Sequence, residues 1–314
     1  MYRIGIDLGG TNIAAGVVDE THHLLGQASL PTLAGRPVEE VVADLGRAAE
    51  LALAEAGVAL TDCSGIGIGS PGACDARRGV VRFVYNLGWI DEVPLCELLS
   101  RRFSLPVFLD NDANCAALAE TVAGAAVGHE SAVLITLGTG VGGGIIIGGR
   151  VYNGYRGAAG ELGHIPLVLG GEVCCCGQKG CWEAYASVTA LIRQTARARR
   201  AHPESLLAET PEEAITGRTA FRAAKAGDET AQAVVRQYAD YVAAGCVTVV
   251  NALAPEVILI GGGISREGDY LLDPIRRYVR RNCFGGECGA VPEIRAAALG
   301  GEAGIIGAAA LCRE

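Results

Sequence analysis

The chain has 314 residues, half of them hydrophobic, which is typical of a globular protein large enough for two domains. Its 26 Lys and Arg residues are outnumbered by 35 Asp and Glu residues, and the net charge of -9 disfavours a protein that binds the phosphates of nucleic acids. Glycine is abundant, at 45 residues, without the three-residue period of collagen. The fold therefore needs many tight turns, or many places where the backbone closely approaches a ligand.

The first elements predict a β-hairpin with a glycine turn. Tyr2 to Asp7 and Ile13 to Val18 are short apolar runs, and Gly9-Gly10-Thr11 lies between them. His23 to Leu30 is expected to add a third strand. Pro37 to Ala56 has apolar residues at helical spacing and acidic residues near its start, which predicts a helix.

Two further strands are predicted in the first half of the chain. Ile66 to Gly69 is a buried run followed by Ser70-Pro71-Gly72, and Val107 to Asp110 is another. A helix is expected to follow from Asn111 to Val122. This pattern of strands and helices indicates an α/β domain.

The hairpin pattern returns in the second half. Ala132 to Leu137 is an apolar run, Gly138 to Gly144 is glycine-rich, and Ile145 to Ile147 is a second run. The echo of the first hairpin indicates an internal duplication, with one hairpin in each domain. The boundary between the domains is expected between Val122 and Ser131, which gives domains of residues 1–122 and 123–300.

The rest of the chain is mostly helical. Its expected elements are the helices Ser187 to Arg199, Thr219 to Ala226 and Asp228 to Ala254, the strand Val257 to Ile260 closed by Gly261-Gly262-Gly263, and a short helix after Gly304.

The glycine turns are candidate phosphate sites. Two stretches match the dinucleotide pattern G-x-G-x-x-G, but neither is followed by the helix that such a site needs, and without a Gly-Lys dipeptide there is no Walker-type loop. Successive backbone N–H groups in such turns can bind an anion, Thr11 adds a hydroxyl, and Asp7 is placed to reach a metal ion. Either turn alone is better explained as a tight hairpin than as a phosphate site. Their recurrence, together with Gly261-Gly262-Gly263, favours a nucleotide.

The sequence Asp110-Asn111-Asp112-Ala113-Asn114 follows a strand and begins a helix. Carboxylates at the ends of such strands face the ligand crevice of α/β sheets, so Asp112 is a candidate base for a substrate hydroxyl. The alternative is a helix N-cap, for which Asp and Asn are also favoured. Spacing alone leaves the two interpretations open.

The cysteines cluster in one loop. His164, Cys174, Cys176 and Cys181 have the arrangement H-x9-C-x-C-G-x2-G-C, which fits tetrahedral Zn²⁺. Closed sites with four protein ligands are usually structural. Cys175 is a spare thiol that could compete as a ligand, and the alternative is a set of reduced cysteines beside a chance histidine.

Two carboxylates flank this loop. Glu161 lies three residues before His164, and Glu183 lies two residues after Cys181. Carboxylates held beside a rigid metal loop are good acceptors for sugar hydroxyls, although either residue alone is also an ordinary surface acid.

Four motifs in order resemble the ROK family of repressors, open reading frames and sugar kinases. They are IDLGGTNI near the start, DNDAN from Asp110, LITLGTGVGGGIIIGGRVYNGYRGAAGELGHIP from Leu134, and CCCGQKGCWEAYAS from Cys174. The resemblance covers the chain from Ile4 to Gly307. It implies two ribonuclease-H-like domains of the actin- and hexokinase-like ATPase fold around a cleft, with the C-terminal helix, about residues 301–314, packing back on the first domain.

The resemblance also implies roles for individual residues. Asp112 would be the base that deprotonates the 6-hydroxyl of a sugar, and His164 would bind zinc with one ring nitrogen and the sugar with the other. The remaining sugar ligands would be Gly72, Asn86, Asn111, Glu161 and Glu183, and the nucleotide would be held by Asp7, Gly9, Gly10, Thr11, Gly138, Thr139, Gly140, Gly262 and Gly263.

The motifs are most similar to those of glucokinases. They imply ATP-dependent phosphorylation of glucose with ATP, Mg²⁺ and structural Zn²⁺, in a cytoplasmic homodimer or dimer of dimers that binds neither nucleic acid nor membrane. The alternatives are a kinase for another hexose or N-acetylhexosamine, a sugar-sensing regulator, or a zinc-stabilised structural protein. Asp110 stands where the family more often has Glu, and Asn12 and Ala14 stand where many members have a lysine.

Overall fold

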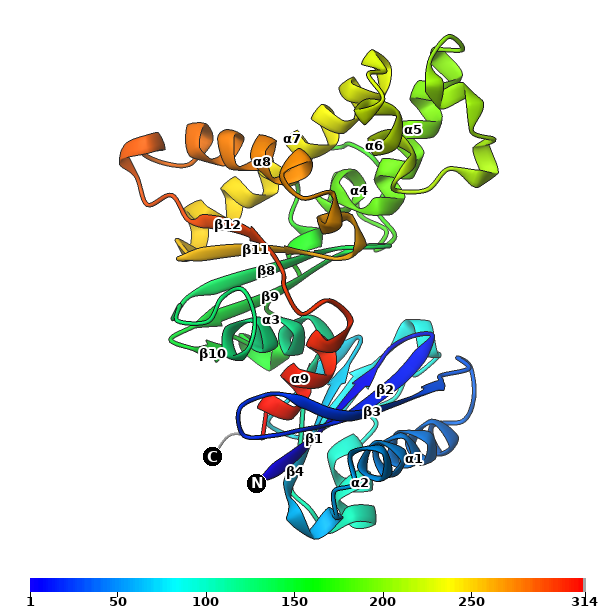
Figure 1. Cartoon of the computed structure of the whole chain (residues 1–314), viewed down its shortest axis with the longest axis vertical. Coiled ribbons are helices and arrows are strands. Elements are labelled where there is room, and N and C mark those ends of the chain that lie inside the picture. The colour runs from blue at the N-terminus through cyan, green and yellow to red at the C-terminus, as the bar shows by residue number, and fades with distance from the viewer. Residues whose placement is uncertain (313–314) are drawn as a thin grey trace. The chain divides into compact units, whose positions relative to one another are not determined.

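The computed structural model describes residues 1–312, and the chain divides into two compact units (Figure 1). The first unit consists of Met1–Glu130, Gly144–Gly160 and the C-terminal stretch that begins at Ala298. The second consists of Ser131–Gly143 and Glu161–Ala297. Among the described residues no helix is both long and apolar enough to cross a lipid bilayer.

The first unit is built on a five-stranded sheet with the order β3-β2-β1-β4-β7. β2 and β3 are antiparallel neighbours and β1 pairs antiparallel with β2, whereas β1, β4 and β7 run parallel. Its elements are β1 (Tyr2–Leu8), β2 (Asn12–Val18), β3 (Leu24–Pro31), α1 (Val38–Ala56), β4 (Cys63–Ser70), the hairpin β5 (Ala73–Asp75) and β6 (Val80–Phe83), α2 (Leu95–Phe103), β7 (Val107–Asn111), α3 (Asp112–Val122), β10 (Arg150–Val151) and α9 (Ala303–Ala310).

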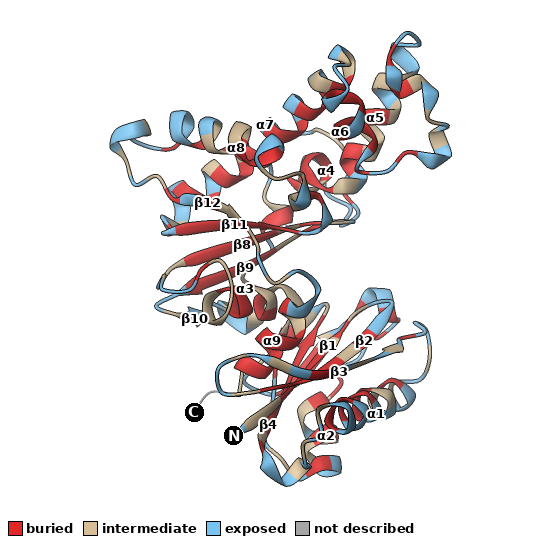
Figure 2. Cartoon of the chain, in the orientation of Figure 1, coloured by how far each residue is buried: buried red, intermediate tan, exposed pale blue. Residues whose placement is uncertain are grey.

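Helix α1 shows how the sequence determines one layer of this unit. Val41, Leu45, Ala48 and Ala52 recur at three- and four-residue spacing, so they lie on one face and are buried against the sheet (Figure 2). The helix ends where Gly57 adopts a left-handed conformation and its N–H closes the last turn on Ala54. α1 and α2 cover one face of the sheet, and α9 and α3 cover the other.

The second unit repeats the same architecture. The second sheet has the order β10-β9-β8-β11-β12, although β10 itself counts with the first unit. In both sheets the strands therefore follow the same order: third, second, first, fourth and fifth along the chain. The predicted duplication is confirmed at this level. Its elements are β8 (Ala132–Leu137), β9 (Val141–Ile147, of which the last four residues count with the first unit), α4 (Glu183–Ala186), α5 (Val188–Ala201), α6 (Thr219–Lys225), α7 (Glu229–Leu253), β11 (Val257–Gly261), α8 (Asp269–Asn282) and β12 (Glu293–Ala296).

Some sequence-based expectations need correction. The glycines from Gly142 to Gly144 were expected in a turn but lie within β9. Gly144 is a glycine for a packing reason, because a Cβ there would overlap Ala113 of α3. The helix predicted for about 301–314 runs over Ala303–Ala310, and residues 313 and 314 lie outside the described residues. The domain limits of 122 and 300 stay predictions, because compact units report contacts and not independent folding.

Candidate active site

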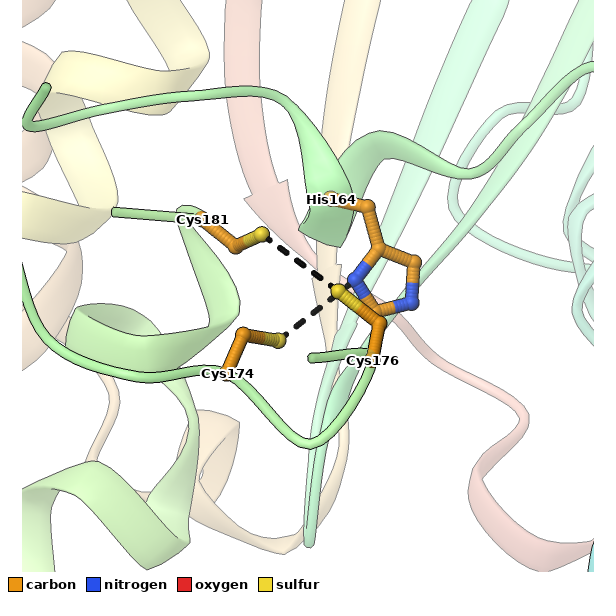
Figure 3. A group of neighbouring side chains, drawn as sticks. All are labelled: His164, Cys174, Cys176 and Cys181. Carbon is orange, nitrogen blue, oxygen red and sulfur yellow. Dashed lines mark hydrogen bonds between the residues drawn. The ribbon is translucent and has the colours of Figure 1, made fainter. Parts of the chain in front are cut away.

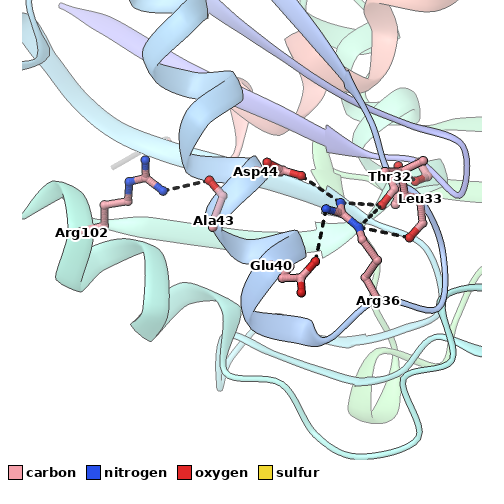
Figure 4. Close-up of polar contacts among 8 residues, drawn as sticks. Thr32, Leu33, Arg36, Glu40, Ala43, Asp44 and Arg102 are labelled. Carbon is pink, nitrogen blue, oxygen red and sulfur yellow. Dashed lines mark hydrogen bonds and ion pairs between the residues drawn. The ribbon is translucent and has the colours of Figure 1, made fainter.

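The turn between β1 and β2 is held by hydrogen bonds from Thr32, which is fully buried. The Thr32 hydroxyl donates to the carbonyl of Gly9 at 2.7 Å, and its N–H donates to the carbonyl of Thr11 at 2.8 Å. Arg36 in turn donates to the Thr32 carbonyl at 2.7 Å and pairs with Asp44 of α1 at 2.9 Å (Figure 4). The turn is therefore fixed from the inside, which leaves its outer backbone face for a ligand.

Asp7 lies directly before this turn, at the end of β1. Burial, together with the negative charge of Asp112, raises the pKa of Asp7 to about 6. Its carboxylate lies against Gly304, where any side chain would overlap it. The buried carboxylate of Asp7 is short of positive partners, so a bound cation would offset the cost of burying its negative charge.

The predicted base stands at the start of α3. Asn111, and not Asp112, is the N-cap of this helix, because its side chain accepts from the N–H groups of Ala113 and Asn114. Asp112 is the first helical residue, and its carboxylate accepts from Ala113 N–H at 2.8 Å. Burial raises the pKa of Asp112, although the backbone hydrogen bond opposes the shift. The N-cap interpretation left open by the spacing is therefore wrong for Asp112.

Two more predicted sugar residues lie beside these groups. The amide of Asn111 donates to the carbonyl of Gly72 at 3.2 Å. Gly72 needs to be glycine, because its φ is 79° and a Cβ would overlap the Phe83 carbonyl. The side-chain nitrogen of Asn86 lies next to Gly10 of the turn between β1 and β2, 2.8 Å from where a Cβ of residue 10 would stand.

Asp110 holds this region together in a way that the motif did not predict. It is buried, and it accepts from Asn111 N–H at 2.7 Å, from the Asn114 amide at 2.8 Å and from the Asn153 amide at 2.9 Å. Asn153 comes from the loop after β10, far away in sequence. The short carboxylate of Asp110 is therefore held by three hydrogen bonds.

The second glycine turn, between β8 and β9, is held by the start of α5. The N–H of Val188 donates to the Gly138 carbonyl, and the Thr189 hydroxyl donates to the Thr139 carbonyl, both at 2.8 Å. A cavity of about 510 Å³ opens beside this turn, and its lining includes Gly138, Thr139, Thr189, Thr216, Gly263 and Ile264. Thr189, Thr216 and Ile264 were not predicted, since nothing in their local sequence marks them.

Gly262 closes the end of β11 next to the same turn. Its φ is 86°, and a Cβ there would overlap the carbonyl of Leu137. Only glycine fits this position without strain. Gly263 follows with open space where a side chain would be, so its backbone is accessible to a ligand.

The four predicted zinc ligands converge (Figure 3). Their ligand atoms all lie within 4.8 Å of one another, with 3.7 Å between the Cys176 and Cys181 sulfurs and 3.6 Å between His164 Nδ1 and the Cys174 sulfur. A tetrahedral zinc with ordinary bond lengths requires about 3.8 Å between two sulfurs and about 3.6 Å between nitrogen and sulfur. The donor set therefore fits Zn²⁺ in its chemistry, and these two separations match tetrahedral spacing.

Glu161 and Glu183 lie beside the group of His164 and the three cysteines. The Nε2 of His164 faces Glu161 at 4.0 Å, while Nδ1 faces the sulfurs. Glu183 begins α4, and its Oε2 accepts from Val141 N–H at 3.0 Å. Burial alone would raise the pKa of Glu183, but hydrogen bonds from Cys175 and Val141 outweigh it and hold the pKa below its usual value.

The predicted residues thus form two groups, one in each unit. Asp7, Gly9, Gly10, Thr11, Gly72, Asn86, Asn111 and Asp112 gather in the first unit, and Gly138, Thr139, Gly140, Glu161, His164, Glu183, Gly262, Gly263 and the cysteines belong to the second.

Comparison with known proteins identifies the family of the chain. The model of the ROK family matches residues 3–314. The glucokinase of Streptomyces coelicolor is 40% identical over 316 residues, which cover 99% of this chain and 97% of the relative. The glucokinase of Thermotoga maritima is 38% identical over 314 residues, with the same coverage of each chain. The crystal structure of a ROK family glucokinase from Streptomyces griseus in complex with glucose and AMPPNP is 40% identical, has a TM-score of 0.83 and is covered to 99%.

Proposed function

The chain belongs to the ROK family, and from that premise we propose that it transfers the γ-phosphoryl group of ATP to the 6-hydroxyl of glucose, giving glucose 6-phosphate and ADP. The proposal is supported by identities of 37–40% to curated glucokinases over essentially the whole chain. The structural observation that carries it is the Asp112 carboxylate at the start of α3, desolvated and next to Asp7. Such a carboxylate is suited to accept the proton of an alcohol.

In the proposed reaction, the 6-hydroxyl oxygen attacks the γ-phosphorus and the bond to the β-phosphate oxygen breaks. The hydroxyl proton passes to Asp112, whose raised pKa favours uptake of that proton. Asn111 keeps Asp112 in place by capping α3, and its amide is one of the proposed sugar contacts. ADP leaves with the electrons of the broken P–O bond.

ATP is proposed to bind along the two glycine turns. The turn of Gly9, Gly10 and Thr11 and the turn of Gly138, Thr139 and Gly140 offer backbone N–H groups to the phosphates. The start of α5 adds the positive end of a helix dipole beside the second turn. The cavity of about 510 Å³ next to Gly263 has room for the adenosine. Mg²⁺ would neutralise the phosphates, with Asp7 as the carboxylate that holds it.

Glucose is proposed to bind through Gly72, Asn86, Asn111, Glu161, His164 and Glu183. Zn²⁺ on His164 Nδ1, Cys174, Cys176 and Cys181 would leave His164 Nε2 free for a hydroxyl. The metal is structural in this proposal, because four protein ligands leave no open position for chemistry. Assembly as a homodimer or a dimer of dimers stays a prediction.

An ADP-release assay over glucose, mannose, fructose, N-acetylglucosamine and N-acetylmannosamine tests the proposal. We expect the highest kcat/KM with glucose. Asp112→Asn should lower kcat about 10²- to 10⁴-fold, which is the range for loss of a general base. Asp91→Asn changes an exposed carboxylate and is the matched control, which should leave kcat unchanged.

Preference for another of these sugars would reassign the substrate within the same reaction. Absence of turnover with all five, combined with retained sugar binding, would support the sugar-sensing regulator instead. Unchanged kcat in Asp112→Asn would remove Asp112 from the catalytic role.

A further inference from the structure

The two oxygens of the Glu183 carboxylate have different partners. Oε2 accepts a hydrogen bond from the backbone N–H of Val141 at 3.0 Å. Oε1 has two thiols beside it, Cys175 at 2.9 Å and Cys174 at 3.3 Å. Gly140 lies so close to Oε2 that a side chain there would overlap it, so the carboxylate is also confined sterically.

Zinc binding would change only one of these two thiols. Cys174 belongs to the set of four ligands, and a cysteine ligates zinc as the thiolate. As a thiolate, Cys174 has no proton to donate and presents a second negative atom 3.3 Å from Oε1. Cys175 lies outside that set of four, and its sulfur remains next to Oε1, at 2.9 Å.

We propose that Cys175 is a positioning residue for Glu183, and that its thiol supplies the hydrogen bond that holds Oε1 in place when the loop carries zinc. The carboxylate is then anchored at both oxygens, by the Val141 N–H on one side and by the Cys175 S–H on the other. The proposal rests on the proposed function, because its consequence is that Glu183 is oriented for a sugar hydroxyl.

The contrasting possibility is that Cys175 is itself a metal ligand. Cys174, Cys175 and Glu183 also bring their ligand atoms within 4.8 Å of one another. That group supplies only three donors, and one of them is the carboxylate assigned to the sugar. The set with His164 has four donors at tetrahedral spacing, so Cys175 is left for the hydrogen bond.

The experiment compares Cys175→Ala, which removes the donor, with Cys175→Ser, which keeps one. In Cys175→Ala we expect the KM and the calorimetric Kd for glucose to rise about threefold to tenfold, as for loss of one hydrogen bond, with kcat changed less than twofold. Cys175→Ser should restore both constants. Cys288→Ala removes another exposed thiol of the same unit and is the matched control.

Zinc content and the spectrum of the cobalt-substituted protein are measured on the same samples. We expect one metal per chain and an unchanged cobalt spectrum in every variant. A lost metal or an altered spectrum in Cys175→Ala would show that Cys175 is a ligand and overturn the proposal. Equal glucose constants in Cys175→Ala and the unaltered protein would overturn it as well.

A measurement without sugar separates this proposal from the proposed function. The infrared difference spectrum between the unaltered protein and Cys175→Ser isolates the S–H stretch of Cys175. We expect this stretch at lower frequency than that of Cys288, which is obtained from the difference with Cys288→Ala. Glu183→Gln should reduce the frequency difference between the two thiols. If the unaltered protein neither binds nor phosphorylates glucose, the proposed function fails, and the S–H frequency still decides whether Cys175 donates to Glu183. An unshifted frequency contradicts the donation.

Discussion

Asp7 illustrates how a single residue connects stability with the proposed function. Its pKa is raised from an ordinary 3.8 to about 6, first by burial and then by the charge of Asp112. The folded chain therefore binds this proton more tightly than the unfolded chain. The contribution of Asp7 to the free energy of unfolding is therefore largest at low pH. It declines as the pH rises from about 4 to about 6 and stays reduced above that range.

Asp7→Asn should therefore stabilise the metal-free protein at neutral pH. The uncharged amide removes the cost of ionising a buried carboxylate, which we expect to be on the order of 1–3 kcal/mol. Calorimetric unfolding at pH 7.5 should give a higher Tm for the variant, and the gap should narrow at pH 5, where much of Asp7 is protonated anyway.

The same substitution should abolish most of the turnover with MgATP, because Asp7 is the proposed magnesium ligand. In the unaltered protein the KM for MgATP should rise as the pH falls below about 6, since the carboxylate is then protonated. Asp91→Asn, at an exposed position, should change neither property. An Asp7→Asn variant that is less stable at neutral pH would contradict this account.

At the scale of single residues, what the sequence predicts depends on local spacing. His164 and the three cysteines could be recognised as a candidate metal set because four potential ligands occur within a short stretch. Thr32 and Arg36, which hold the turn between β1 and β2, could not be recognised, because a threonine at the end of a strand and a single arginine are ordinary. Thr32 is important because its hydroxyl donates to the carbonyl of Gly9, which lies 23 residues away along the chain.

At the scale of elements, helix α9 depends on glycines that let backbones meet. A Cβ at Gly5 or Gly67 in the sheet would overlap carbonyls of α9, and a Cβ at Gly307 of α9 would overlap the carbonyl of Cys115 in α3. The high glycine content is therefore partly structural, in addition to the turns proposed to bind ATP. The sequence predicted the helix but not this use of its glycines, because the contacts are between segments distant in the chain.

Gly307→Ala tests this close packing. Alanine ordinarily favours a helix over glycine by about 1 kcal/mol, but here the new methyl group must push α9 away from α3. We expect a net loss of at least about 2 kcal/mol in the free energy of unfolding by urea. Gly301→Ala, at a position with open space around it, is the control and should be neutral. A neutral Gly307→Ala would mean that α9 is free to shift.

The two hairpins were easier to anticipate than some of the elements that complete each unit. The two hairpins are marked by glycine turns between apolar runs, and the common order of the two sheets follows from their duplication. Helix α2 was missed because its nine residues give few repeats of a helical pattern. The insertion of β5 and β6 was missed because its strands are only three and four residues long.

At the scale of the whole molecule, the two tryptophans report separately on the two units. Trp89 belongs to the first unit and is buried in its core. Trp182 belongs to the second and directly follows Cys181, a proposed zinc ligand. It packs on Gly245 and donates from its indole N–H to the carbonyl of Tyr241 at 2.8 Å. Trp89→Phe and Trp182→Phe therefore leave a single fluorescent reporter in the second and in the first unit, respectively.

Removing zinc with a chelator should loosen the second unit first. A structural zinc contributes its binding free energy to folding, so its loss lowers the stability of the segment that it closes. We expect the urea midpoint reported by Trp182 to fall, and the midpoint reported by Trp89 to fall less. Cys181→Ser should lower the Trp182 midpoint before chelation and make it insensitive to the chelator. No shift at Trp182 would contradict the zinc proposal, and identical shifts at both tryptophans would show that the units unfold as one, since the chain passes between them at residues 130, 143, 160 and 297.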